Sequence, residues 1–128
     1  MKKKILVVDD EEVIRILYKE ELEDDGYDVI TTSEGSRLIE LIDREKPDLV
    51  VLDIKIANYD GLDLLQDIRK RFYNVPVILC SAYSSFKGDI KSIAADYYVV
   101  KSADLLELKQ KIKMALEGNI PTHMFNKY

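Results

Sequence analysis

The chain has 128 residues, enough for one domain with a substantial core and too few for two. Its formal net charge of -5 argues against nucleic acid as a direct ligand, because binding phosphates requires a basic face. The apolar run that begins at Ile5 stops at Asp9, short of the ~7–15 residues of a signal-peptide core, and no stretch is long enough to cross a membrane. A cytoplasmic location is therefore expected.

The first half of the chain alternates between strand-like and helix-like segments. A continuous apolar run at residues 5–8 predicts a parallel strand covered on both faces. Apolar residues spaced from Ile14 to Leu22 predict a helix closed by Gly26. Residues 27–31 alternate weakly, which is typical of an edge strand. A second helix is expected to open near Ser33 and to end before Pro47.

The second half repeats the alternation. Further buried strands are expected at residues 49–52, 77–80 and 97–100. Helices are expected from Gly61 to Phe72, more weakly over 86–94, and from Leu105 to Ala115, where Asp104 and Glu107 have capping-box spacing. Five βα units predict an α/β three-layer sandwich with a parallel five-stranded sheet. The domain is expected to cover residues 1–117, with 118–128 a tail or linker stub.

Polar residues follow four of the predicted strands, always at the carboxyl end. They are Asp9 and Asp10, Asp53, Ser81, and Lys101. Because ligands of open parallel sheets bind beyond the carboxyl ends of the strands, these residues are expected to share one rim. Carboxylates without a nearby His or Cys favour Mg²⁺, with Mn²⁺ possible. Lys101 and Ser81 could then hold phosphate oxygens, and a carboxylate could attack phosphorus. The residues alone leave open which acid is the nucleophile.

Several short motifs, taken together, are specific to one protein family. These are the Asp9-Asp10-Glu11 turn, the stretch from Asp53 to Asp60-Gly61-Leu62, the Ser81-Ala82 pair, and Tyr98 three residues before Lys101. Over about residues 3–117 the chain resembles the receiver domain of two-component response regulators. The resemblance implies a flavodoxin-like sandwich with strand order 2-1-3-4-5.

The resemblance also implies roles for the rim residues. Asp53 would be the phosphoacceptor, Asp10 a direct Mg²⁺ ligand and Asp9 a ligand acting mainly through water, while the Lys55 backbone carbonyl would complete the metal shell. Ser81 and Lys101 would hold the phosphoryl oxygens. Strand alternation places Tyr97 and Tyr98 on opposite faces, so only one of them can be the aromatic switch, and the spacing to Lys101 favours Tyr98.

The expected partners follow from the histidine content. His123, the sole histidine, lies in the predicted tail, so the phosphoryl donor must be a histidine on a sensor kinase or a histidine phosphotransfer protein. The resemblance places its docking site on the first helix, around Ile14 to Tyr18. A downstream protein target would read the face made by the fourth helix, fifth strand and last helix. The chain is expected to be a monomer or weak dimer, and no enzyme beyond Mg²⁺-dependent self-phosphorylation from a donor and slow self-dephosphorylation.

The chain departs from the family pattern at several positions. Ser102 follows Lys101 where proline is common, and a cis bond there would cost ~2.5–4 kcal/mol, so a trans bond is predicted. Ala57 replaces another usual proline. The segment between Ser81 and Lys101 is also short, which puts the fourth helix in doubt. Lys55 and Tyr83 would flank the path of an attacking water and slow hydrolysis, or else simply point into solvent.

Four functions compete at this point. The first is a stand-alone receiver, for example a phosphorelay intermediate, and the second is the receiver piece of a longer regulator with an output domain. The third is a degenerate receiver that binds partners without phosphorylation. A phosphohydrolase using Asp53 is least favoured, because such enzymes place a second acid where this chain has Lys55.

Overall fold

The computed structural model describes residues 2–56, 59–82, 95–101 and 104–118. The predicted fourth helix and the tail after Gly118 therefore lie outside the described residues. The elements within them run in the following order: β1 (Lys4–Val8), α1 (Glu12–Asp24), β2 (Asp28–Thr32), α2 (Leu38–Glu45), β3 (Leu49–Asp53), β4 (Lys55–Ile56), β5 (Tyr59–Asp60), α3 (Gly61–Arg71), β6 (Val77–Ser81), β7 (Tyr97–Val100) and α4 (Leu106–Leu116).

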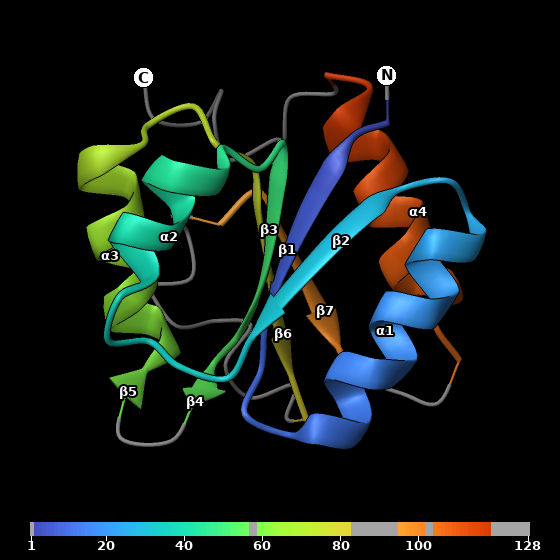
Figure 1. Cartoon of the computed structure of the whole chain (residues 1–128), viewed down its shortest axis with the longest axis horizontal. Helices are drawn as coiled ribbons and strands as arrows, with labels where there is room; N and C mark the ends of the chain where they lie inside the picture. Colours follow the sequence, from blue (N-terminus) through green and yellow to red (C-terminus); the bar gives the residue numbers. More distant parts are fainter. Residues whose placement is uncertain (1, 57–58, 83–94, 102–103, 119–128) are drawn as a thin grey trace.

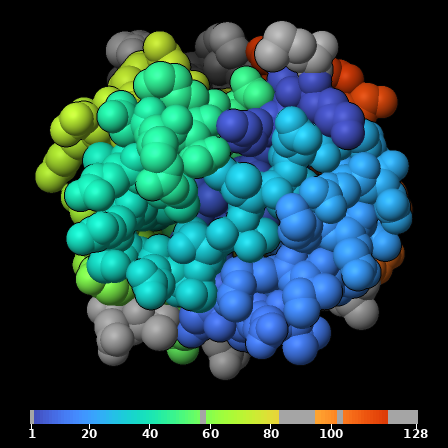
Figure 2. Space-filling view, in the orientation of Figure 1, coloured from blue at the N-terminus to red at the C-terminus, as the bar shows by residue number. Residues whose placement is uncertain are grey.

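The main sheet has five strands in the order β2-β1-β3-β6-β7, and every neighbouring pair is parallel. Counted among these five alone, the order is 2-1-3-4-5, so the predicted flavodoxin-like topology is confirmed. Helices α2 and α3 lie on one side of the sheet and α1 and α4 on the other (Figure 1). The predicted edge position of β2 is also confirmed. In the space-filling view, its cyan atoms reach the surface between those of α2 and α1 (Figure 2).

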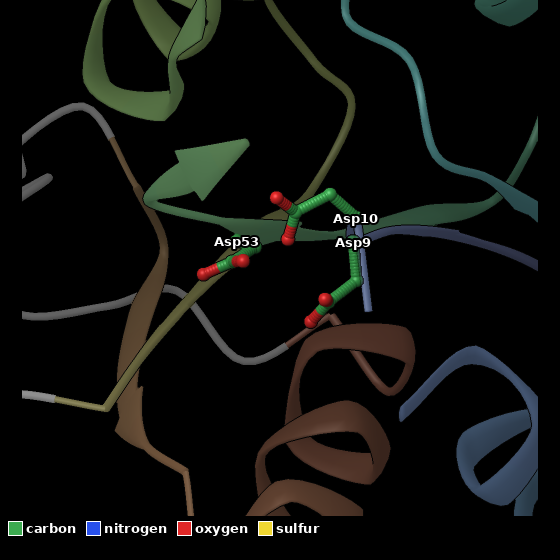
Figure 3. A group of neighbouring side chains, drawn as sticks. All are labelled: Asp9, Asp10 and Asp53. Atoms are coloured by element: carbon green, nitrogen blue, oxygen red, sulfur yellow. The ribbon is translucent and has the colours of Figure 1, made fainter. Parts of the chain in front are cut away.

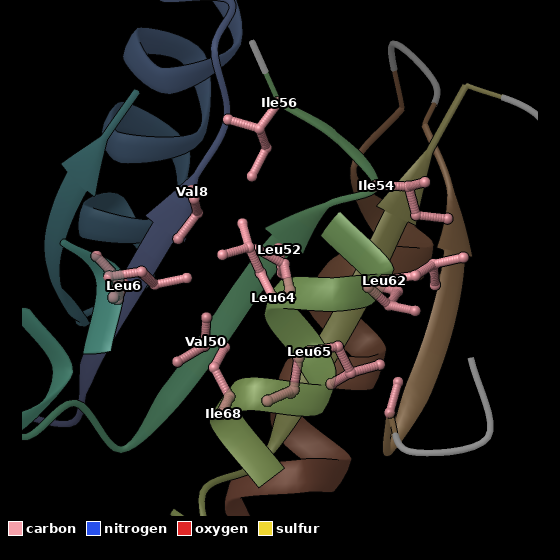
Figure 4. Packing of buried hydrophobic residues seen from close by; sticks show 14 of the residues in the cluster. Leu6, Val8, Val50, Leu52, Ile54, Ile56, Leu62, Leu64, Leu65 and Ile68 are labelled. Carbon is pink, nitrogen blue, oxygen red and sulfur yellow. The ribbon is translucent and has the colours of Figure 1, made fainter. Parts of the chain in front are cut away.

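Two hydrophobic clusters, one on each face of the sheet, explain the continuous apolar runs. Val50 and Leu52 of β3 pack with the α2–α3 side, while Leu49 and Val51 pack with the α1–α4 side. Figure 4 shows how α3 inserts Leu65 and its neighbours against the first of these faces. A central strand buried on both faces has no polar side to alternate with, which is why the pattern predicted it correctly.

The boundaries of the helices follow local chemistry. Helix α1 is followed by Gly26 at φ +96°, as predicted for a helix terminator. Helix α2 begins at Leu38, so the prediction that it opens near Ser33 is wrong. The Thr32 hydroxyl instead accepts a hydrogen bond from the Glu34 backbone N–H (3.2 Å), a side-chain turn that competes with helix initiation. Before α4, Asp104 accepts a bond from the Leu106 N–H (2.9 Å).

The connection from β3 to α3 contains a feature that sequence patterning did not predict. Strands β4 and β5 pair antiparallel, with Lys55 opposite Asp60. Asp60 then caps α3 by accepting a hydrogen bond from the Leu62 N–H (2.8 Å). In the part of the chain that the structure describes, no helix is both long enough and apolar enough to cross a membrane.

Candidate functional site

The carboxyl ends of four sheet strands deliver polar side chains to one rim. Asp9 directly follows β1, Asp53 ends β3, Ser81 ends β6, and Lys101 directly follows β7. The parallel register brings these ends level, since Asp53 lies opposite Cys80 and the Ser81 carbonyl accepts a bond from the Lys101 N–H (2.7 Å). The residues that the sequence placed at one rim are therefore brought together.

Three carboxylates form the centre of this rim. One oxygen from each of Asp9, Asp10 and Asp53 lies within 4.8 Å of the others. Asp9 and Asp53 are buried, with 2% and 5% of their surface exposed, whereas Asp10 is exposed. Figure 3 shows Asp53 approaching from β3 and the other two from the end of β1. Two unit charges ~4 Å apart repel by about 4 kcal/mol at an effective dielectric of 20, so the cluster requires a cation.

In this structure the cation is Lys101. Its ammonium Nζ lies 2.7 Å from Asp9 Oδ2, 3.3 Å from Asp53 Oδ2 and 3.5 Å from Glu11 Oε1. The side chain is 12% exposed, so this is a largely desolvated ion-pair network. A point charge on a flexible stem can change partners without moving the backbone, which suits a group that must follow a phosphate oxygen.

Hydrogen bonds with backbone groups hold the two buried aspartates. Asp9 Oδ1 accepts from the Glu11 N–H (2.9 Å), and the Asp9 N–H donates to the Thr32 carbonyl (3.1 Å) at the end of β2. Asp53 Oδ1 accepts from the Lys55 N–H (3.3 Å). Sequence reasoning gave no role to Glu11 or Thr32. The signal for Thr32 was present, because it too lies at the carboxyl end of a strand.

Burial and charge shift the acid–base behaviour of the site. Burial, together with the neighbouring charge of Asp9, raises the pKa of Asp53 to about 6 from 3.8, and Lys101 only partly opposes this rise. Burial alone would lower the pKa of Lys101, but its hydrogen bond to Asp9 and the charge of Asp53 raise the pKa above its ordinary value. The site thus disfavours the ionised form of Asp53 and favours the protonated form of Lys101.

Replacing Asp53 by asparagine is expected to stabilise the metal-free protein at pH 7. The folded state raises the pKa of Asp53. The contribution of this group to the free energy of unfolding is therefore fully present below about pH 4 and is lost as the group ionises up to about pH 6. An asparagine side chain cannot ionise, and Asp53→Asn should therefore gain about 1–2 kcal/mol at pH 7 and nothing at pH 3.5. Urea unfolding in EDTA at both pH values measures this, with the exposed Asp67→Asn as control. Equal gains at both pH values would contradict the ionisation argument.

Ser81 and Tyr98 are joined by a side-chain hydrogen bond, which lowers the pKa of Tyr98 against the larger raising effect of burial. Tyr98 packs against the α2–α3 cluster, whereas Tyr97 packs against the α1–α4 cluster, with Lys111 Nζ 5.4 Å from its ring centre. The predicted opposite orientation of the two tyrosines is confirmed. Ser81 therefore links the rim to the tyrosine on the α2–α3 side.

The remaining candidates lie at the margin of the rim or beyond it. Lys55 and Ala82 are exposed beside Asp53 and Ser81. Tyr83, Ser102 and Ala57 lie outside the described residues, and so does the predicted trans bond at Ser102.

The donor set fits a hard divalent cation. All three side chains offer carboxylate oxygens, and Mg²⁺ binds oxygen at ~2.0–2.1 Å, which places neighbouring ligands about 3–4 Å apart. The present spread of up to 4.8 Å requires only a small contraction. Binding of a cation would also relieve the repulsion that raises the pKa of Asp53.

The sheet order and a rim with three carboxylates and a lysine match the arrangement expected of a receiver domain. The chain belongs to the response regulator receiver domain family, whose sequence profile matches residues 5–113. Receiver domains of this family serve two-component signalling.

Known relatives and structures agree with this assignment. The chain is 36% identical to the alkaline phosphatase synthesis transcriptional regulatory protein PhoP of Bacillus subtilis, over 91% of the chain and 49% of the relative. It is 33% identical to sporulation initiation phosphotransferase F of the same organism, over 91% of the chain and 95% of the relative. The chain thus spans about half the length of several curated relatives and nearly all of another.

Among solved structures, the response regulator TrrA of Thermotoga maritima in complex with Mg²⁺-BeF has a TM-score of 0.85 and 44% identity, covering 88% of this chain and 98% of TrrA. A second structure shows TrrA in complex with the histidine kinase ThkA, with a TM-score of 0.84 and 45% identity, covering 89% of this chain and 98% of that one.

Proposed function

We propose that this domain accepts a phosphoryl group on Asp53 from a phosphohistidine of a partner protein. The observation that carries the proposal is the convergence of a buried carboxylate, Asp53, and a largely buried lysine, Lys101, in a cluster with two further acids. The complex of TrrA with Mg²⁺-BeF supports it, as a related protein at 44% identity.

In this proposal Asp10, Asp53 and the Lys55 carbonyl hold Mg²⁺ directly, and Asp9 holds it through water. Bound Mg²⁺ would supply positive charge for the phosphoryl oxygens. Asp53 contributes the attacking oxygen: its O–P bond forms as the P–N bond to the donor imidazole breaks, and the imidazole leaves. Lys101 follows one phosphoryl oxygen away from Asp9, and the Ser81 hydroxyl donates to another.

The donor would be a sensor histidine kinase or a histidine phosphotransfer protein docked on α1. Val13 and Ile16 are large apolar residues on this helix, 74% and 52% exposed, and the helix starts two residues after Asp10. Apolar side chains exposed beside a reaction site suit a protein partner. The complex of TrrA with the kinase ThkA is the related example.

The decisive experiment is intact-mass measurement after incubation with Mg²⁺ and acetyl phosphate. We expect one added phosphoryl group in the parent and none in Asp53→Ala or in EDTA. A parent protein that gains no phosphoryl group and releases no phosphate would reject the proposal in favour of a phosphorylation-independent binding module.

Tyr98 is proposed to carry the signal from the rim. Drawing Ser81 toward the phosphoryl group breaks its bond to Tyr98, which then turns inward and alters β7 and α4. Amide chemical shifts should change on phosphorylation as far as α4 in the parent, and only at the rim in Tyr98→Ala. Tyr97→Ala, on the opposite face, is the control. Changes in α4 that persist in Tyr98→Ala would exclude it as the switch.

Lys55 is proposed to slow loss of the phosphoryl group, together with Tyr83. Its side chain is exposed two residues beyond Asp53, and pairing of β4 with β5 holds its backbone. Lys55→Ala should open the approach of water and speed dephosphorylation about threefold or more, while the remote Lys46→Ala should not. The measurement is the decay of phosphoprotein after removal of the donor. Equal decay in Lys55→Ala and the parent would show that the side chain points away from the water path.

We propose two alternatives for the protein that contains this domain. Its near-complete match to sporulation initiation phosphotransferase F favours a stand-alone phosphorelay intermediate. The matches over half of longer transcriptional regulators favour a receiver joined to an output domain. Immunoblotting of the host cells separates them, because a species much larger than 14.8 kDa supports only the second.

A further inference from the structure

Asp9 is held at every polar backbone and side-chain group. Its N–H donates to Thr32, its Oδ1 accepts from the Glu11 N–H, and its Oδ2 contacts Lys101. The last group, the backbone carbonyl, accepts a hydrogen bond from Arg15 Nη1 at 2.8 Å. This bond reaches back from the first turns of α1 to the loop that precedes the helix.

The Asp9 carbonyl has a particular importance, because it belongs to the peptide unit that joins Asp9 to Asp10. Peptide units are planar, so holding this oxygen sets the orientation of the plane and the direction in which Asp10 leaves it. Asp10 is exposed and follows the last residue of β1 by two positions, outside the sheet ladder. Figure 3 shows its carboxylate turned toward the other two acids.

We infer that Arg15 is a positioning residue for the metal site: it orients the Asp9–Asp10 peptide so that the Asp10 carboxylate meets those of Asp9 and Asp53. This inference rests on the proposed function, because it assigns Arg15 to the Mg²⁺ site. The guanidinium also places a permanent positive charge next to the acidic loop without occupying the rim. Groups that orient metal ligands commonly change metal affinity by about 10–100-fold when removed.

The chain offers a matched control on the same helix. Lys19 Nζ donates to the Val29 carbonyl at 2.8 Å, which is also a bond from a cationic α1 side chain to a strand carbonyl, but at a residue near the start of β2 and away from the rim. Arg15→Met and Lys19→Met each remove one such bond and one charge. Arg15→Lys keeps the charge and alters the geometry.

The test is Mn²⁺ titration by electron paramagnetic resonance with Mg²⁺ competition, together with thermal unfolding in EDTA. Arg15→Met should weaken Mn²⁺ and Mg²⁺ binding about tenfold and Arg15→Lys about threefold, with Lys19→Met within twofold of the parent. In acetyl phosphate assays, Arg15→Met should need more Mg²⁺ for half-maximal phosphorylation and reach the parent rate at saturation. A merely structural role would instead lower the unfolding temperature in EDTA and leave the affinity unchanged.

The two ways in which the inference could fail are distinguishable. If the parent binds Mg²⁺ and phosphorylates Asp53 while Arg15→Met binds Mg²⁺ within twofold of the parent, the role of Arg15 is overturned and the proposed function stands. If the parent itself binds neither Mn²⁺ nor Mg²⁺, the proposed function and the role of Arg15 both fall.

Discussion

Replacing Gly61 by alanine is expected to destabilise the domain by about 3 kcal/mol or more and to slow phosphorylation of Asp53 at least about tenfold. A Cβ atom at Gly61 would overlap the Asp53 carbonyl oxygen and lie 2.6 Å from Ile54 Cα. Both obstacles are backbone atoms, so no side chain can rotate to make room. The Gly61 N–H also donates to the Ile54 carbonyl (2.6 Å), which ties α3 to the end of β3.

Relief of this clash requires α3 to move away from the strand that carries Asp53. The stability effect should appear as an unfolding temperature lower by roughly 10 °C. Gly26→Ala is the control: its φ of +96° makes alanine strained, but nothing lies within 4 Å of the added atom and the residue is far from the rim. It should lose stability without losing phosphorylation. An unfolding temperature and phosphorylation rate for Gly61→Ala equal to those of the parent would refute the close contact.

Replacing Asp96 by alanine is expected to cost about 3–4 kcal/mol without changing the phosphorylation rate at low temperature. Asp96 Oδ2 accepts from Arg69 Nη2 and from the Val77 N–H, both at 2.7 Å. Arg69 also donates to the carbonyls of Val75 and Tyr73. The side chains of Arg69 and Asp96 are 17% and 13% exposed, so removing the carboxylate takes a counter-charge from a largely desolvated guanidinium and an acceptor from the Val77 N–H.

The control for this prediction is the exposed pair of Lys46 and Asp43, with side chains 78% and 60% exposed. Asp43→Ala should cost less than about 0.5 kcal/mol. A double-mutant cycle of Arg69→Met and Asp96→Ala, followed by urea unfolding, should show strong non-additivity. If Asp96→Ala proves no more damaging than Asp43→Ala, the ion pair contributes nothing beyond an exposed one.

The sheet was predictable because the same burial condition applies to each of its buried strands. A strand covered on both faces must be apolar at every position, and the runs within β1, β3 and β6 satisfy this condition. The run in β7 was also expected to be buried, but this strand ends the sheet order and only Val99 is fully buried. The start of α2 was missed because one local bond, from the Glu34 N–H to Thr32, decides it. The pairing of β4 with β5 was missed because two residues per strand carry no measurable periodicity.

The rim residues were predictable for a related reason. Asp9, Asp53, Ser81 and Lys101 each end or follow a strand, and parallel strands end together. No role was predicted for Arg15 or for Glu11, because no strand-end rule applies to them. Arg15 acts on a backbone carbonyl six residues earlier, and such a bond depends on the angle at which the helix leaves the loop.

The two proposed functional residues lie on strands that differ in their number of hydrogen-bonded neighbours. Asp53 is carried by β3, which has a hydrogen-bonded strand on each side, whereas Tyr98 is carried by β7, which ends the sheet order and pairs with β6 alone in the described chain. Local opening should therefore cost the most free energy at the phosphoacceptor and less at the switch. Hydrogen exchange should be slowest in β3 and faster in β7. The geometry around Asp53 on β3 can then stay fixed during phosphorylation, while the more easily opened β7 changes conformation and transmits the change at Tyr98.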